Sequence, residues 1–179
     1  FRRRPSAARL AEWREWLDEA ADRFERPGFL EADPLGIPHR YANPEDAAVA
    51  GFFAATLAWG NRKSILRSCH ALLDRMDDAP AEFVASASLE ELRRLDDFVH
   101  RTYQGEDARR FVLCLRSLEP DGGLQGVFEA AFRDAPDTAG RPGVPDAGVA
   151  LHAFKARFFQ DHPAGRTSKH VADPLKGSA

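Results

Sequence analysis

The sequence predicts an all-α fold, and two observations support this prediction. Runs in which β-branched and polar side chains alternate, the pattern of strands, are almost absent. Apolar residues instead recur every three to four positions along most of the chain, which is the spacing of one helix face. The chain has 179 residues, 44% of them hydrophobic and 30% charged, which is enough for a sizeable core. We therefore expect one helical domain, with roughly eight helices.

The first predicted helix begins after Ser6, whose hydroxyl can cap it, and runs to about Phe24. Pro27-Gly28 then ends it. Its apolar residues form a stripe at helical spacing: Leu10, Trp13, Trp16, Leu17, Ala20 and Phe24. A loop rich in turn-forming residues is expected next, from residue 33 to residue 44.

The second predicted helix lies at the centre of the core. Residues 44–46, Pro-Glu-Asp, suit a first helical turn, because proline fits there and negative charge meets the positive helix end. From there to Trp59 the chain is apolar on nearly every side, as a central core helix is. Gly60-Asn61 is expected to end this helix.

Shorter helices are predicted in the rest of the chain. A one-sided stripe runs from Ile65 to Met76, another helix begins at Pro80, and a capping box at Ser88 opens a third. The remaining expectations are a connector at 98–103, helices at 106–118 and 124–132, a mobile loop at 134–145, a last helix from Pro145, and a polar, basic tail over 160–179.

Composition excludes several classes of protein. The longest apolar stretch, from Val49 to Trp59, is too short to cross a bilayer, and no secretory signal is visible. Cys69 and Cys114 lie within apolar helical patterns, where we expect free, buried thiols. These points favour a cytoplasmic protein. The net charge of −3 gives no overall support for nucleic-acid binding, so any such site must be local.

No motif indicates a bound cofactor. Phosphate-binding loops, dinucleotide glycine motifs and Cys-x-x-Cys pairs are absent from the sequence. The histidines have no metal-ligand spacing. We therefore expect neither a metal nor another cofactor in residues 1–179.

Three polar groups are candidates for a binding site. The first is Trp59-Gly60-Asn61-Arg62-Lys63, where a buried helix reaches a turn and Asn61 could present its amide between two cations. The alternative is a helix C-cap, in which glycine and asparagine are common.

The second group is His100-Arg101, in the predicted connector. Its arginine could bind a phosphate group, or it could pair with Asp97, Glu106 or Asp107.

The third group lies in the tail and consists of Arg166, Lys169, His170 and the turn that holds Lys176, Gly177 and Ser178. The amide groups of a glycine-containing turn at a helix start can bind an anion. Such a site would need a helix after Ala179, and without it we expect a loosely ordered tail. The chain starts at Phe1, so we expect it to be a piece of a longer protein.

The order of these motifs resembles a bacterial family of unknown function, domain of unknown function 2400. The resemblance rests on an ordered set that covers nearly the whole chain: Asp33-Pro34-Leu35, Ala55-Thr56-Leu57-Ala58-Trp59-Gly60-Asn61-Arg62, Phe98-Val99-His100-Arg101, Gly122-Gly123-Leu124, Lys169-His170 and Pro174-Leu175-Lys176-Gly177-Ser178-Ala179. The family looks like a remote relative of the helix-hairpin-helix DNA glycosylases.

That second resemblance implies a DNA-binding role. The Lys176-Gly177-Ser178-Ala179 turn would correspond to the hairpin that grips the phosphate backbone, and Asn61 or a neighbour would fill the gap of a flipped base. The catalytic lysine and aspartate implied by the family pattern would lie beyond residue 179, so no catalytic residue is assigned and the enzymatic activity stays open.

The leading interpretation is a DNA-binding, glycosylase-like domain in DNA repair or maintenance. Its expected partner is duplex DNA, damaged duplex included, and no membrane. The predicted DNA-binding residues are Asn61, Arg62, Lys63, His100, Arg101, Arg166, Lys169, His170, Lys176, Gly177 and Ser178. The alternatives are a non-catalytic nucleic-acid-binding module and a protein-interaction module.

Overall fold

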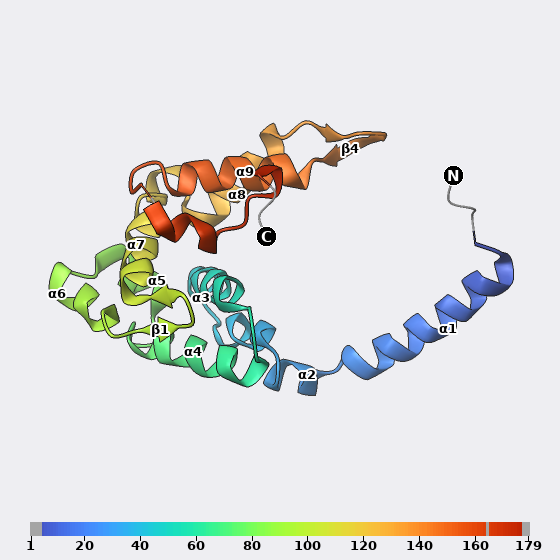
Figure 1. Ribbon diagram of the computed structural model, residues 1–179, viewed down its shortest axis with the longest axis horizontal. Coiled ribbons are helices and arrows are strands. Elements are labelled where there is room, and N and C mark those ends of the chain that lie inside the picture. The colour runs from blue at the N-terminus through green and yellow to red at the C-terminus, as the bar shows by residue number, and fades with distance from the viewer. Residues whose placement is uncertain (1–4, 164, 177–179) are drawn as a thin grey trace.

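A computed structural model describes residues 5–163 and 165–176 and confirms the all-α prediction. Figure 1 shows the helices from α3 onward following a curved path, while α1 projects away from them. The α-helices are α1 (Ala7–Phe24), α2 (Pro27–Glu31), α3 (Pro44–Leu57), α4 (Arg62–Asp74), α5 (Pro80–Ser86), α6 (Leu89–Leu92), α7 (Gly105–Arg116), α8 (Gly123–Asp134) and α9 (Ala147–Phe158).

Short turns of 3₁₀-helix and two small hairpins connect these helices. The 3₁₀ turns are η1 (Pro34–Gly36), η2 (Pro38–Arg40), η3 (Arg93–Leu95), η4 (Glu119–Asp121), η5 (Gly165–His170) and η6 (Pro174–Lys176). The strands are β1 (Val99–His100), β2 (Tyr103–Gln104), β3 (Asp137–Thr138) and β4 (Arg141–Pro145). Both hairpins are antiparallel. Among the residues described, no helix is long and apolar enough to cross a bilayer.

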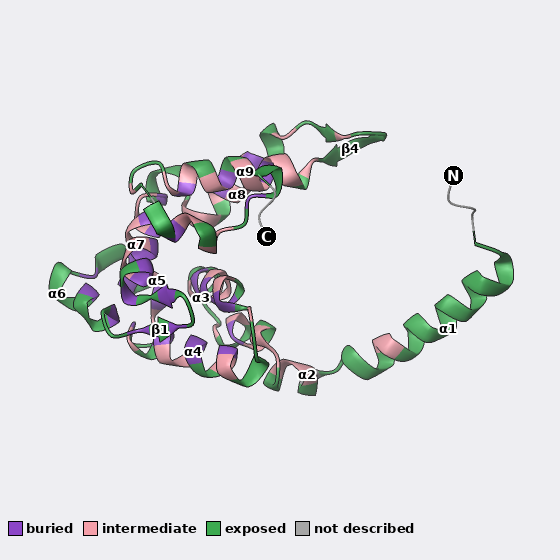
Figure 2. Cartoon of the chain, in the orientation of Figure 1, coloured by how far each residue is buried: buried purple, intermediate pink, exposed green. Residues whose placement is uncertain are grey.

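The helix α1 forms as predicted, but its apolar stripe does not reach the core. Ser6 caps it, because the Ser6 hydroxyl accepts a hydrogen bond from the Arg9 amide at 3.3 Å. Within α1, all of which is described, no residue is buried. Figure 2 shows this helix almost wholly in the colour of exposed residues.

The helix α3 is the central core helix that its composition predicted. Asn43 caps it by accepting a hydrogen bond from the Glu45 amide at 2.8 Å. The Asp46 carboxylate accepts a hydrogen bond from the Ala81 amide at 2.9 Å and so fixes the start of α5 against α3. The helix ends at Leu57 rather than at Trp59. Ala58 and Trp59, which were predicted to be helical, therefore lie outside the helix.

Phenylalanine rings join α3 to α7 and α9. The ring of Phe111 lies 6.4 Å from that of Phe53 and 5.2 Å from that of Phe158, between centroids. Phe52 on α3 also approaches Phe158, at 5.2 Å. Such contacts stabilise a fold beyond simple burial of area, by about 0.5–1.5 kcal/mol per pair. The aromatic cluster thus fixes α7 against α3 and α9. Residues 165–170 pack against the start of this helix.

Two segments expected to be irregular are hairpins. Residues 98–103 were expected to be a connector, but β1 pairs with β2 through Val99 opposite Gln104 and His100 opposite Tyr103. Residues 134–145 were expected to be a loop, but most of this segment forms the exposed β3–β4 hairpin, with Gly140 at φ +75° in its turn. Most of these strands carry too few residues to show alternation, which is why no strand was predicted here.

Candidate functional site

The turn between α3 and α4 exposes the first predicted group. Asn61 is the N-cap of α4, because its amide oxygen accepts hydrogen bonds from the backbone of Lys63 (3.1 Å) and Ser64 (3.4 Å). The alternative of a C-cap of α3 is therefore wrong for Asn61, and Ala58 has that position. Gly60 precedes the cap with φ +112°, a backbone conformation that L side chains rarely adopt.

The start of α4 is unusually positive. A helix N-terminus carries a partial positive charge and favours acidic side chains, yet the first turn of α4 has none and begins Arg62-Lys63. Both side chains are exposed. Arg62 is partly compensated, because its guanidinium lies 3.5 Å from the Asp33 carboxylate and over the ring of Phe29. Helix stability does not account for this pair of cations.

The β1–β2 hairpin brings the second predicted group to the first. The Arg101 guanidinium lies over the Trp59 ring, 5.3 Å from its centroid. A Cβ atom on Gly60 would lie 2.4 Å from Arg101 Nη2, so the arginine packs directly against the glycine backbone. We name the set of half-buried Trp59 and exposed Gly60, Asn61, Arg62, Lys63 and Arg101 the Trp59 surface.

Arg101 is not used in a local ion pair. Its three candidate acids pair with other arginines: Asp97 with Arg75 (3.1 Å), Glu106 with Arg110 (3.6 Å) and Asp107 with Arg166 (2.9 Å). Within residues 5–163 and 165–176, Arg101 forms no ion pair at all. Its φ of +55° is uncommon for a residue with a side chain. The hairpin turn therefore holds an exposed, unpaired arginine in a strained conformation.

His100 lies behind the Trp59 surface rather than on it. The residue is 3% exposed, and its ring meets the Trp59 ring edge-on at 5.7 Å. Its Nδ1 shares a hydrogen bond with the Ser68 hydroxyl at 2.8 Å. Burial lowers the pKa of His100, and the charge of Arg101 lowers it further, while nearby carbonyls of Trp59 and Leu57 oppose the shift. The His100 ring is therefore buried behind the surface, whereas its predicted companion Arg101 is exposed on it.

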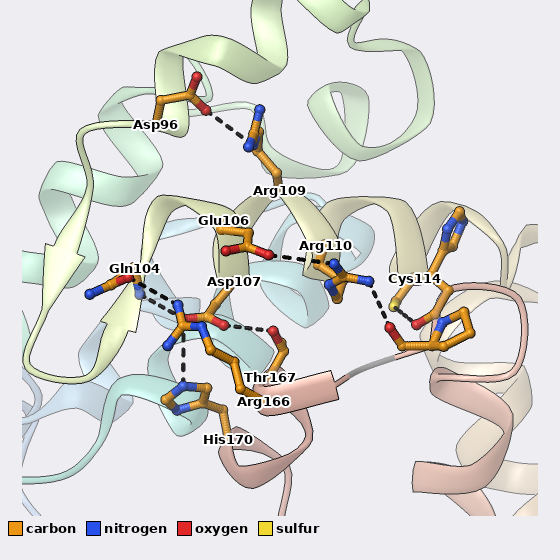
Figure 3. A network of polar contacts seen from close by, with 12 residues as sticks. Asp96, Gln104, Glu106, Asp107, Arg109, Arg110, Cys114, Arg166, Thr167 and His170 are labelled. Atoms are coloured by element: carbon orange, nitrogen blue, oxygen red, sulfur yellow. Dashed lines mark hydrogen bonds and ion pairs between the residues drawn. The ribbon is translucent and has the colours of Figure 1, made fainter.

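The tail packs on a buried carboxylate at the start of α7. Asp107 is fully buried, and it accepts hydrogen bonds from Arg166 (2.9 Å), from the Thr167 hydroxyl (2.6 Å) and from the backbone of Gln104 (2.8 Å). Figure 3 shows these contacts converging from α7 and η5. The prediction of a loosely ordered tail is therefore wrong for residues 165–170, because Asp107 requires their donors.

His170 belongs to the same buried cluster. Its side chain is 4% exposed, and its ring meets that of Tyr103 edge-on at 5.0 Å. Its Nε2 lies 3.6 Å from Asp107 but forms no hydrogen bond among the described residues, and the Tyr103 hydroxyl forms none either. Burial lowers the pKa of His170, although the charge of Asp107 opposes this shift. His170 therefore anchors the tail and is not placed to bind DNA directly.

The other tail residues lie in different surroundings. Arg166 is part-exposed but engaged by Asp107, and Lys169 is exposed beside it in η5. Lys176 is exposed in η6, which packs against α9 rather than on the Trp59 surface. Gly177 and Ser178 lie outside the described residues. Contacts of Arg166 and His170 thus hold η5 beside the hairpin. Lys169 is exposed in η5 and forms no ion pair among the described residues.

Sequence reasoning did not identify the centre of this arrangement. From the sequence, Asp107 is predicted only as a possible partner of Arg101, and no pattern singles out Thr167. The one local signal is the Gln104-Gly105-Glu106-Asp107 spacing at the start of α7, where Gln104 and Asp107 form a capping box. Among the residues described, no group of His, Cys, Asp and Glu has a geometry that could hold a metal ion.

Comparison with known proteins places this chain in one family. The model of that family, described as Protein of unknown function (DUF2400), matches residues 33–179, which is most of the chain. The chain belongs to the DUF2400 family. The match includes the Trp59 surface and the Asp107 cluster but not α1. No curated protein and no solved structure matches the chain.

The turn at Gly60 yields a first prediction. We expect Gly60→Ala to reduce the free energy of unfolding by about 1–3 kcal/mol, because alanine strains a backbone at positive φ. Urea denaturation of the variant and of the unaltered chain measures this difference in unfolding free energy. Gly28→Ala is the control, since a Cβ atom there would meet nothing within 4 Å and its φ is not positive. Equal stability of the two variants would show that the turn adopts another conformation.

The buried carboxylate yields a second prediction. We expect Asp107→Ala to reduce the free energy of unfolding by about 2–4 kcal/mol, because it leaves the Thr167 hydroxyl and the Gln104 amide without an acceptor. Residues 165–170 should lose protection in hydrogen–deuterium exchange. The control is Glu106→Ala, because Glu106 is adjacent but exposed. It should reduce the free energy of unfolding by at most about 1 kcal/mol. Unchanged exchange in residues 165–170 would contradict the role of Asp107 as their anchor.

The two buried histidines yield a third prediction. Both have lowered pKa values when folded, whereas unfolding restores a value of about 6.5. The unfolded state then binds more protons below that pH, so stability present above pH ~6.5 is lost as pH falls toward the folded pKa values. Urea denaturation between about pH 7 and pH 5 should show a shallower pH dependence for the His100→Gln/His170→Gln variant. If the stability of the variant and of the unaltered chain depended on pH in the same way, the two histidines would not be the cause.

Proposed function

We propose that the domain binds duplex DNA through the Trp59 surface. The observation that carries this proposal is Arg101, which is exposed, unpaired among the described residues and fixed over Trp59 by a strained turn. The contact with Trp59 contributes about 0.5–1 kcal/mol at an exposed site, and no carboxylate among the described residues compensates the charge of Arg101. Strained residues of this kind occur at binding sites, where the ligand compensates for the strain.

The charges around Arg101 support a phosphate ligand. Some arginines elsewhere pair with acids, as Arg94 does with Asp77 and Arg109 with Asp96, and those that do not, such as Arg141, lack the contact with an aromatic ring in a strained turn that Arg101 has. On the Trp59 surface, Lys63 and Arg101 have no acidic partner among the described residues, and Arg62 keeps only its 3.5 Å contact with Asp33. Phosphate contacts supply most of the affinity of proteins for DNA. A local excess of positive charge on the Trp59 surface is compatible with the overall charge of −3.

We further propose a role in DNA repair or maintenance. The support is the resemblance to helix-hairpin-helix DNA glycosylases, in which the end of a buried helix carries a residue that enters the gap of a flipped base. Here α3 is the buried helix and the Trp59 surface follows its end. Because Asn61 is engaged as an N-cap, we assign the gap-filling role to its neighbour Arg101, with Trp59 as the ring that supports it.

Duplex binding at two salt concentrations tests this proposal. The probes are an undamaged duplex and the same duplex with an abasic-site analogue. We expect Arg101→Ala to weaken binding about tenfold and to reduce the salt dependence by about one phosphate contact. The control is Arg141→Ala, because Arg141 is an exposed arginine on the distant β3–β4 hairpin.

The outcomes separate the alternatives. Tighter, salt-dependent binding to the abasic analogue supports a repair role, while equal, salt-dependent binding to both duplexes leaves a general DNA-binding module. No binding to either duplex, or the same loss from Arg101→Ala and Arg141→Ala, contradicts the proposal.

A further inference from the structure

The exposed stripe of α1 has the pattern of a helix-pairing surface. Leu10, Trp13, Leu17, Ala20 and Phe24 are spaced alternately by three and four residues, which is the a/d pattern of a coiled coil. Leu10, Trp13, Leu17 and Phe24 are each exposed over about half of their surface. We name these five residues the α1 seam. An exposed apolar seam of this length indicates a surface that a partner covers.

The α1 seam does not belong to the family domain. The family match begins at residue 33, after α1 has ended. Figure 1 shows α1 projecting away from the helices that form the core, and no residue of α1 is buried. Within the described chain, the seam therefore has no partner helix.

The charges beside the α1 seam are all positive. At helical spacing, Arg9, Arg14 and Arg23 lie at the edges of the seam. Two of them contact its rings, since the Arg9 guanidinium lies 5.4 Å from the Trp13 centroid and that of Arg23 lies 5.2 Å from the Phe24 centroid. The acidic residues of α1 lie on the opposite face: Glu12, Glu15, Asp18, Glu19 and Asp22.

This distribution disfavours pairing with a second copy. Flanking charges determine which helices pair in a coiled coil. A parallel second copy would bring Arg9 against Arg14 of that copy, and an antiparallel one would bring Arg9 against Arg23 of that copy. Both arrangements place like charges together. Duplex DNA is also disfavoured, because a phosphate backbone bound by the arginines would leave the apolar seam uncovered.

We propose that the α1 seam binds an amphipathic helix whose own apolar seam is flanked by acidic residues. Apolar contacts along the two seams supply the attraction, and the arginines select acidic flanks and reject basic ones. This proposal is independent of the proposed DNA site, since it uses none of the residues of the Trp59 surface.

The test uses two synthetic heptad peptides with leucine at the seam positions. One peptide has glutamate at the flanking positions, and the other has lysine there. Binding is followed by titration calorimetry and by the blue shift of tryptophan fluorescence. We expect the glutamate peptide to bind, and the lysine peptide to bind at least about tenfold more weakly.

Variants of α1 locate the binding surface. Leu17→Glu should abolish peptide binding without changing the melting temperature, because Leu17 is exposed in the fold. The Arg9→Glu/Arg14→Glu/Arg23→Glu variant should reverse the preference toward the lysine peptide. Glu15→Gln, on the opposite face, is the matched control and should bind as the unaltered chain does.

Four outcomes would overturn the proposal. They are equal affinity for the two peptides, binding of neither, a dimer of the chain alone that Leu17→Glu dissociates in sedimentation, and loss of duplex DNA binding in Leu17→Glu. The third would show that a second copy covers the seam, and the fourth that the seam belongs to a DNA surface.

Discussion

The buried carboxylate of Asp107 is the interaction on which the arrangement of the site depends. A fully buried charge must be compensated, and α7 provides only the capping contact with Gln104. The other donors come from Arg166 and Thr167, about 60 residues farther along the chain. Satisfying Asp107 therefore brings the tail to the start of α7. Figure 3 shows that the tail then lies beside β2, at the same hairpin that carries Arg101.

The β1–β2 hairpin joins the two halves of the site because its residues face different partners. His100 and Tyr103 are buried and oppose one another across the hairpin, His100 against Trp59 and Tyr103 against His170. Arg101, in the turn, is exposed over Trp59. Burial of the two paired residues fixes the turn, and the turn fixes the cation. The strain at Arg101 is thus maintained by packing beneath it, which is how a protein holds a side chain ready for a ligand.

Local rules predicted the helices of this protein, whereas the site arises from contacts distant in sequence. Helical spacing and caps such as Ser6 and Ser88 were sufficient for α1 and α6, since those signals act within a few residues. Of the residues predicted to bind DNA, Asn61, Arg62, Lys63, Arg101 and Lys169 are exposed in the structure. It could not show that the hairpin places Arg101 on Trp59, or that Asp107 prefers Arg166 to Arg101. Those outcomes depend on the packing of α3, α7 and the tail.

Chemical-shift mapping of the isotope-labelled protein with duplex DNA tests whether residues 59–63 and the turn of the β1–β2 hairpin form one DNA-binding surface. We expect the backbone amides of Asn61 and Lys63, the Arg101 Nε–H and the Trp59 indole N–H to shift together, at one common affinity. Signals that did not move, a different affinity for Asn61 than for Arg101, or shifts on another face of the domain would contradict this.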